Sequence, residues 1–271
     1  MRPSIIEAYQ SISYVFLSAR WISSKEIRYL CSSLTLTDLE IDGGNITTYK
    51  ETEAFVRNKT LTRLHLIHDP VSDRAAKILA RNTTLIELGL NHNVIGNRGA
   101  YALAKNNTLL NLYLNQNQIE DWGVDALAKN TTLTDLELQN NQFGLQGIKA
   151  LAKNPTLIRL DITGNKINGS GFKALVKNIS IITLKFNVNK NIKEAIALRK
   201  NTTLTTIYIR SIHICDTAIW ELTETNHVRH QDSCIKSIMI KESGDIFPMD
   251  ILRFIFLPYL HHPFMSCVYM Y

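Results

Sequence analysis

Apolar residues recur along this chain with a fixed period of 24 residues. The stretch Leu85–Thr108 reads LIELGLNHNVIGNRGAYALAKNNT, and the stretches 109–132, 133–156 and 157–180 repeat its skeleton. The fixed apolar positions of the first copy are Leu85, Leu88, Leu90, Ile95 and Leu103. A period in this range is the signature of a solenoid, in which each unit buries its apolar face against the next unit.

Less regular copies extend the pattern in both directions. Counting back, further units open at Leu61, Leu36 and Ile12. Counting forward, they open at Ile181, Leu204 and, after a longer spacer, Ile235. We therefore expect ten units covering nearly the whole chain, with irregular units at both ends, where a solenoid needs caps.

Within a unit, the alternation xLxLx predicts a short strand. Leu88 and Leu90 would point into the core, and Glu87, Gly89 and Asn91 would point out. Stacked units would pair these strands into a parallel sheet with neighbours about 4.8 Å apart, whereas a helix on the other side is about 10 Å across. This mismatch bends the stack, so the sheet lies on the concave side.

The pattern LxxLxLxxN…GxxALA resembles leucine-rich repeats of the ribonuclease-inhibitor-like type, most specifically from Leu61 to Ile209. The resemblance implies an α/β fold: a leucine-rich-repeat solenoid, or horseshoe, with a concave parallel β-sheet and convex helices. These units are shorter than is usual for that group, so short helices are expected. The chain would divide into an N-terminal cap with a degenerate first repeat (1–33), leucine-rich repeats (34–245) and a hydrophobic C-terminal cap (246–271).

Asparagine and basic residues follow the same period. An Asn stands eight positions after most opening residues, where its amide is expected to hydrogen-bond the backbone of the adjacent turn. A Lys or Arg stands four positions before each opening residue, and an Asn usually follows it. This order suits a helix end, because the cation complements the helix dipole and Asn tolerates a left-handed residue. The first set is Asn93, Asn117, Asn141, Asn165 and Asn189, and the second is Arg57, Arg81, Lys105, Lys129, Lys153, Lys177 and Lys200.

The net charge of +6 and the pI near 9.1 raise the question of a nucleic-acid partner. Seven of the positive charges belong to the periodic row at the helix ends. That row has no aromatic platform interleaved with it in the repeat pattern, so we expect no nucleic-acid binding.

Cysteine usage and the chain's first residues bear on localisation. The four cysteines are widely spaced, which favours reduced thiols in a cytosolic setting. Eight N-x-S/T sequons occur, and glycans at the helix ends would crowd the packing, which argues against a eukaryotic secretory route. Residues 1–20 contain Glu7 and keep the repeat register, so a cleaved signal peptide is not expected. There is also no apolar run long enough for a membrane span. We expect a cytoplasmic protein, or one secreted into a host cell without a cleaved signal peptide.

The outward strand positions are the candidate binding residues, because they change from unit to unit while the scaffold positions do not. Aromatic and Arg side chains dominate interface hot spots, so Tyr113, Arg159 and Tyr208 rank first. Glu137 and Asp161 follow as steering charges. An alternative is that these positions form only a solvated sheet surface. The full predicted set is Arg63, His65, Glu87, Tyr113, Asp135, Glu137, Arg159, Asp161, Lys185 and Tyr208.

Two C-terminal motifs suggest other functions. Cys215, His227, His230 and Cys234 are a donor set that Zn²⁺ accepts, but their spacing matches no standard zinc motif, and small apolar packing explains the cysteines better. The segment 247–260 resembles the opening helix of an F-box, which would make the chain a substrate adaptor of a ubiquitin ligase. A hydrophobic cap on the last repeat, or a membrane-surface helix, is the alternative for this segment.

No catalytic motif is present: the sequence lacks a Gly-rich phosphate loop, HExxH and GxSxG. We therefore expect a non-catalytic protein–protein interaction module, monomeric and without a cofactor or metal, that binds a partner protein on its concave face. The regular ALAKNxT units look like repeats of leucine-rich-repeat effectors of intracellular bacteria, which would imply a eukaryotic host protein as the partner.

Overall fold

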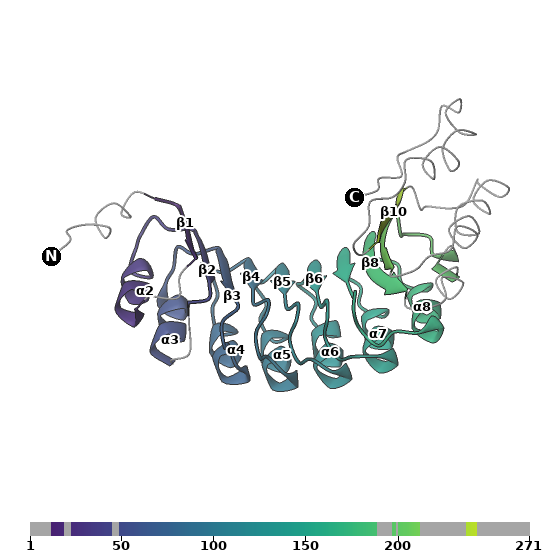
Figure 1. Cartoon of the computed structure of the whole chain (residues 1–271), viewed down its shortest axis with the longest axis horizontal. Coiled ribbons are helices and arrows are strands. Elements are labelled where there is room, and N and C mark those ends of the chain that lie inside the picture. Colours follow the sequence, from purple (N-terminus) through teal and green to yellow (C-terminus); the bar gives the residue numbers. More distant parts are fainter. Residues whose placement is uncertain are drawn as a thin grey trace, which may run out of the picture.

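The computed structural model shows an arc with strands on its inner side and helices on its outer side (Figure 1). It describes residues 12–18, 23–44, 49–188, 197–198, 200–211 and 237–242, and the statements below concern these residues. The predicted α/β solenoid with a concave parallel sheet and convex helices is confirmed.

One parallel sheet of ten strands lines the inside of the arc, and the strand order follows the chain. Each strand pairs with the equivalent residues of the next unit, so Leu88 is opposite Leu64 on one side and Leu112 on the other. The strands are β1 (Tyr14–Ser18), β2 (Asp38–Asp42), β3 (Arg63–Ile67), β4 (Glu87–Gly89), β5 (Asn111–Tyr113), β6 (Asp135–Glu137), β7 (Arg159–Asp161), β8 (Thr183–Val188), β9 (Thr206–Ser211) and β10 (Ser237–Glu242).

The helices on the outer side are 7 to 9 residues long, as the short repeat predicts. They are α2 (Ser24–Leu30), α3 (Tyr49–Arg57), α4 (Asp73–Leu79), α5 (Asn97–Leu103), α6 (Asp121–Ala128), α7 (Leu145–Leu151) and α8 (Gly169–Leu175). A capping box opens α2: the Ser23 hydroxyl accepts from the Glu26 amide, and the Glu26 carboxylate accepts from the Ser23 amide.

A single apolar core runs between sheet and helices. In every unit from Leu36 to Ile209, the opening residue and the residues three and five positions after it are buried. Phe143 fills the +10 position that Ile or Val occupies elsewhere, and Phe172 packs on Phe186 at 4.8 Å between ring centroids. The core is therefore continuous from unit to unit.

Close packing of neighbouring helices explains the glycine in the repeat. A Cβ at Gly123 of α6 would lie 2.7 Å from the Asn97 Oδ1 of α5 and 2.8 Å from the Ile119 side chain. That Asn97 oxygen also accepts from the Gly123 amide at 3.1 Å. Asp73 and Asp121 accept from the next unit in the same way. Because glycine has no side chain, the first residue of one helix can accept a hydrogen bond from the backbone of the next helix.

The predicted role of the strand-exit asparagines is confirmed at the four that lie in the described part of the chain. Asn117 is typical: its Nδ2 donates to the Leu90 carbonyl at 2.8 Å, and its Oδ1 accepts from the Ile95 amide at 2.9 Å. Both partners belong to the preceding unit, so the side chain joins two units. Asn189 lies outside the described residues.

The role predicted for the helix-end asparagines is wrong in its detail. They do not take the left-handed conformation; their buried side chains bridge units. Asn130 donates to the Ala104 and Asn106 carbonyls at 3.0 and 2.8 Å, and its Oδ1 accepts from the Thr132 and Leu133 amides. The Nδ2 atom that would carry a glycan at this sequon is thus engaged inside the protein. The basic residues also lie one or two positions beyond most helices, as Lys105 does after α5.

Left-handed residues occur instead where the chain leaves the strand, seven positions after the opening residue. There φ lies between 52° and 73° in six successive units. Two units use glycine and four use His, Asn or Gln, of which Asn and His tolerate this conformation better than most residues. The residues are Gly43, His68, His92, Gln116, Asn140 and Gly164.

Several sequence predictions concern residues that the structure does not describe. They are the donor set Cys215, His227, His230 and Cys234 and the F-box-like segment 247–260. The division of the chain at residues 33 and 245 is likewise untested. These remain predictions.

Candidate partner-binding face

The outward residues of the strands form two columns along the inside of the arc. One column contains Arg63, Glu87, Asn111, Asp135 and Arg159, each opposite the next in the strand register. The second column contains His65, Gly89, Tyr113, Glu137, Asp161, Lys185 and Tyr208. The sheet therefore brings all ten predicted binding residues onto one face, as the alternation pattern predicts.

A cluster around Glu87 joins three strands. The Glu87 carboxylate is 2.8 Å from the His65 Nε2 and accepts from the Asn111 Nδ2 at 2.9 Å and from the Tyr113 hydroxyl at 3.4 Å. Partial burial opposes ionisation of Glu87, but the hydrogen bonds from Asn111 and His65 outweigh it, so its pKa lies below the usual value. The carboxylate is held ionised and in place.

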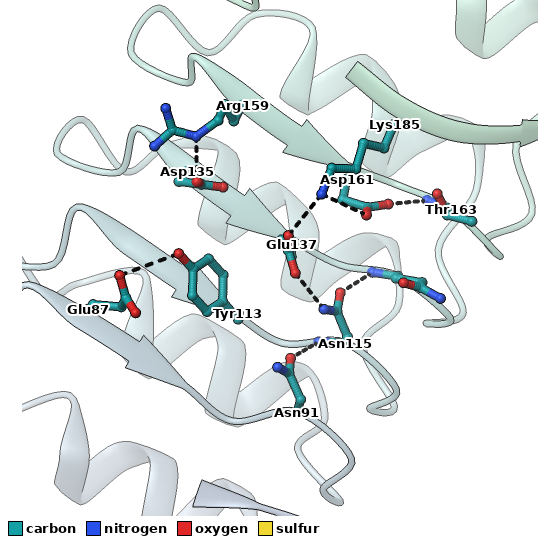
Figure 2. A network of polar contacts seen from close by, with 11 residues as sticks. Glu87, Asn91, Tyr113, Asn115, Asp135, Glu137, Arg159, Asp161, Thr163 and Lys185 are labelled. Carbon is teal, nitrogen blue, oxygen red and sulfur yellow. Dashed lines mark hydrogen bonds and ion pairs between the residues drawn. The ribbon is translucent and has the colours of Figure 1, made fainter. Parts of the chain in front are cut away.

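Tyr113 lies at the centre of the face, with carboxylates on several sides (Figure 2). The His65 and Tyr113 rings form a T-shaped pair, with 5.8 Å between centroids and an interplanar angle of 83°. Burial and the negative charges of Glu87, Asp135 and Glu137 raise the pKa of the Tyr113 phenol. The ring is therefore a neutral, half-buried platform between acidic groups.

Glu137 stands opposite Tyr113 in the strand register and forms a second cluster (Figure 2). Its carboxylate accepts from the Asn115 Nδ2 at 2.7 Å and from the Lys185 Nζ at 3.3 Å. Lys185 also lies 3.8 Å from Asp161 and 5.9 Å from the centroid of the Tyr208 ring. One ammonium thus spans carboxylates from two strands.

The charged groups in this second cluster shift each other's pKa values. Burial of Lys185 opposes its charge, but attraction to Glu137 and Asp161 outweighs it, and the pKa of Lys185 is raised. Burial also raises the pKa of Asp161, although the Thr163 amide donates to it at 2.9 Å and Lys185 attracts it.

Two arginines each bind an aspartate on the neighbouring strand. Arg159 donates from Nε to Asp135 at 2.6 Å, and Arg63 binds Asp38 in the same way. The aspartates raise the pKa of both guanidinium groups. The arginine side chains are more than half exposed, so these pairs add little stability and can exchange partners.

The face is acidic although the chain is basic. Between Asp38 and Tyr208 the two columns contain six carboxylates and three cations, a net charge of −3 with His65 neutral, whereas the chain carries +6. The carboxylates are Asp38, Glu40, Glu87, Asp135, Glu137 and Asp161, and the cations are Arg63, Arg159 and Lys185. A face of this sign favours a basic partner surface.

Sequence reasoning missed the asparagines that hold these residues. Besides Asn111, an amide ladder runs along the strand exits: Asn91 Oδ1 accepts from the Asn115 amide at 2.9 Å, and Asn115 Oδ1 accepts from the Gln139 amide at 2.7 Å. The recurrence of Asn at the sixth position after Leu85 and Leu109 was the available signal.

Two further features were sought in the described part of the chain. No group of three or more metal-binding side chains was found there, and no helix there is long and apolar enough to cross a membrane.

Comparison with known proteins identifies the repeat. Four consecutive segments, residues 81–104, 105–128, 129–152 and 153–176, match a family model described as "Leucine Rich repeat". Residues 81–176 are therefore four leucine-rich repeats, and the solenoid that contains them has the open horseshoe fold. No curated protein matches. Leucine-rich-repeat folds are typical of protein interaction modules and generally act as non-catalytic binding scaffolds.

Solved structures with similar architecture include two internalins of Listeria monocytogenes. Internalin C2 is 24% identical, with a TM-score of 0.45 over 66% of this chain and 74% of that one. A second internalin is 17% identical, with a TM-score of 0.42 over 99% of this chain and 90% of that one. Similarity of this degree says nothing about what this chain binds.

Proposed function

We propose that this protein is a non-catalytic binding module whose concave face holds a partner protein. The partner presents a basic side chain to the centre of that face, between Glu87, Tyr113 and Glu137. The observation that carries the proposal is the position of Tyr113, an aromatic platform among carboxylates on an acidic face of a basic chain.

The chemistry of this centre suits a Lys or Arg side chain. A cation over the Tyr113 ring gains from the ring quadrupole, and carboxylates within reach add charge-assisted hydrogen bonds. The hydrogen bonds to Glu87 and Glu137 hold both acceptors before the partner arrives, which reduces the ordering cost of binding. Arg159 and Tyr208 extend the contact toward the C-terminal side.

The nature of the repeat directs the search for the partner. Because the ALAKNxT units look like those of effectors that intracellular bacteria deliver, the proposed partner is a eukaryotic host protein. The protein itself would then act inside the host cell.

Affinity capture from a eukaryotic cell lysate tests the proposal. The baits are the intact protein, Tyr113→Ala/Glu137→Lys, and a control, Lys59→Gln/Lys166→Gln, that alters exposed residues away from the concave columns. We expect a protein retained by the intact bait and the control but lost with the double variant, and released by salt. A captured set that is the same for all three baits, with circular dichroism confirming folding, would contradict concave-face recognition.

A further inference from the structure

The outer, convex side of the arc carries a charge opposite to that of the concave face. In α4–α8 and the residues that end them, ten cations stand against three carboxylates, a net charge of +7. All ten cations are exposed, whereas Asp73 and Asp121 bind backbone amides of the next unit. The cations are Arg74, Lys77, Arg81, Arg98, Lys105, Lys129, Lys149, Lys153, Lys173 and Lys177.

Two exposed aromatic side chains interrupt this basic surface. Tyr101 of α5 and Trp122 of α6 are 43% and 53% exposed, and their rings stack at 5.6 Å between centroids. The Lys105 ammonium lies 4.3 Å from the centroid of the Tyr101 ring. The expectation that no aromatic platform accompanies the basic row is therefore wrong.

The repeat itself shows that the scaffold does not require these aromatics. The position of Tyr101 is Lys or Asp in the neighbouring units, and the position of Trp122 is Arg, Gln or Ser. The equivalents of Tyr101 are Lys77, Asp125, Lys149 and Lys173, and those of Trp122 are Arg74, Arg98, Gln146 and Ser170. An exposed aromatic pair in place of solvated residues points to a contact outside the molecule.

The aromatic pair also sits where the molecule protrudes most. Helices α4, α5 and α6 form the outermost part of the arc, and the helices on either side recede from it (Figure 1). A flat surface approaching from this side therefore meets α5 and α6 first. The concave sheet faces the opposite direction and stays open to its own partner.

We infer that the convex face docks on an anionic phospholipid bilayer, with Tyr101 and Trp122 entering the headgroup region and the surrounding Lys and Arg binding lipid phosphates. Trp and Tyr favour that region, and basic residues next to it are attracted by anionic lipid. A single-stranded nucleic acid fits less well, because it needs a groove and free ring faces for its bases, whereas this surface is convex and the two rings stack on each other.

Vesicle binding by the full-length protein tests this inference. We expect binding to phosphatidylcholine vesicles that contain phosphatidylserine, a loss of binding at high salt, and little binding to pure phosphatidylcholine. Arg98→Gln/Lys149→Gln should weaken binding roughly fivefold per residue, whereas the off-face control Lys59→Gln/Lys166→Gln should change it far less. Equal binding to both kinds of vesicle, or equal weakening by the two variants, would overturn the inference.

The aromatic contribution is tested at constant charge. The double variant Tyr101→Gln/Trp122→Gln uses Gln because Gln146 of α7 stands at the position equivalent to Trp122. It should bind anionic vesicles roughly tenfold more weakly while its circular dichroism is unchanged. The blue shift of tryptophan fluorescence on adding these vesicles should disappear with Trp122→Gln alone. Unchanged vesicle binding by the double variant, or binding of a single-stranded oligonucleotide in preference to vesicles, would show that the inference is wrong.

Discussion

The imidazole of His65 occupies the space above Gly89. A Cβ built on Gly89 would lie 2.8 Å from the His65 Cγ, closer than carbon atoms approach without a shift. The absence of a side chain at Gly89 therefore lets His65 reach across β4 to the Tyr113 ring while it also contacts Glu87 on β4. The column position without a side chain, Gly89, therefore lies beneath the cluster of His65, Glu87 and Tyr113.

The change Gly89→Ala tests that relationship. We expect His65 to be displaced from Tyr113, with the stability changed by about 1 kcal/mol or less, because Ala is the better strand residue and partly offsets the clash. NMR of the histidine ring protons would report the displacement. Gly96→Ala is the matched control, since its Cβ would approach no heavy atom closer than 3.5 Å. Unchanged His65 signals in Gly89→Ala would contradict the packing described here.

The buried helix-end asparagines should contribute strongly to stability. Asn130→Ala leaves the Ala104 and Asn106 carbonyls and the Thr132 and Leu133 amides without their partner. We expect a loss of about 3 kcal/mol or more in the free energy of unfolding, measured by urea denaturation. Asn107→Ala, at an exposed position, should cost less than about 0.5 kcal/mol. Similar losses in the free energy of unfolding for both variants would mean that the buried helix-end asparagines are not what joins the units.

The Glu87 cluster predicts a pH dependence of stability. Because the folded-state pKa of Glu87 is lowered, its contribution is present above its unfolded-state pKa and is lost as the pH falls through the folded value. Glu87→Gln should therefore be less stable than the wild type near neutral pH, by on the order of 1 kcal/mol, with the difference shrinking below about pH 4. Denaturation curves across this range give the measurement. Glu40→Gln, in the neighbouring column, keeps all these hydrogen bonds and is the control; a pH-independent difference for Glu87→Gln would contradict the prediction.

Removing a cation from the concave face should strengthen attraction of a basic partner. Arg159→Gln frees the Asp135 carboxylate and changes the charge of the two columns from −3 to −4. Association with the captured partner should become several-fold faster at low salt, measured by surface plasmon resonance. Arg98→Gln makes the same charge change on the convex face and should have a smaller effect. Slower association for Arg159→Gln would contradict this prediction and would indicate that the partner presents acidic groups to the face.

The repeat period explains how much of the fold the sequence predicts. A 24-residue step brings residues such as Tyr113 and Glu137 opposite each other in the sheet, and the strand alternation decides which face they occupy. Both columns, the short helices and the strand-exit asparagines follow from this rule. The repeat rule does not predict where the left-handed residues lie. Their position depends on the path of one turn, and four residue types occupy it.

Contacts between side chains were less predictable than their columns. The reach of Lys185 to Glu137 crosses one strand, β7, and the His65–Tyr113 contact depends on the absence of a side chain at Gly89 between them. The convex pair was visible in the sequence, since Tyr101 and Trp122 break the polar character of their repeat positions. Their stacking follows only once α5 and α6 lie side by side.

Selection of a peptide display library on the immobilised protein tests the central claim most directly. The comparison is between the intact protein and Tyr113→Ala/Glu137→Lys, with Lys59→Gln/Lys166→Gln as the control. The proposed basic anchor predicts that peptides selected on the intact protein and the control share a Lys or Arg, and that this preference disappears with the double variant. Selected peptides without a basic residue, or the same peptides on all three proteins, would contradict recognition of a basic side chain at Tyr113.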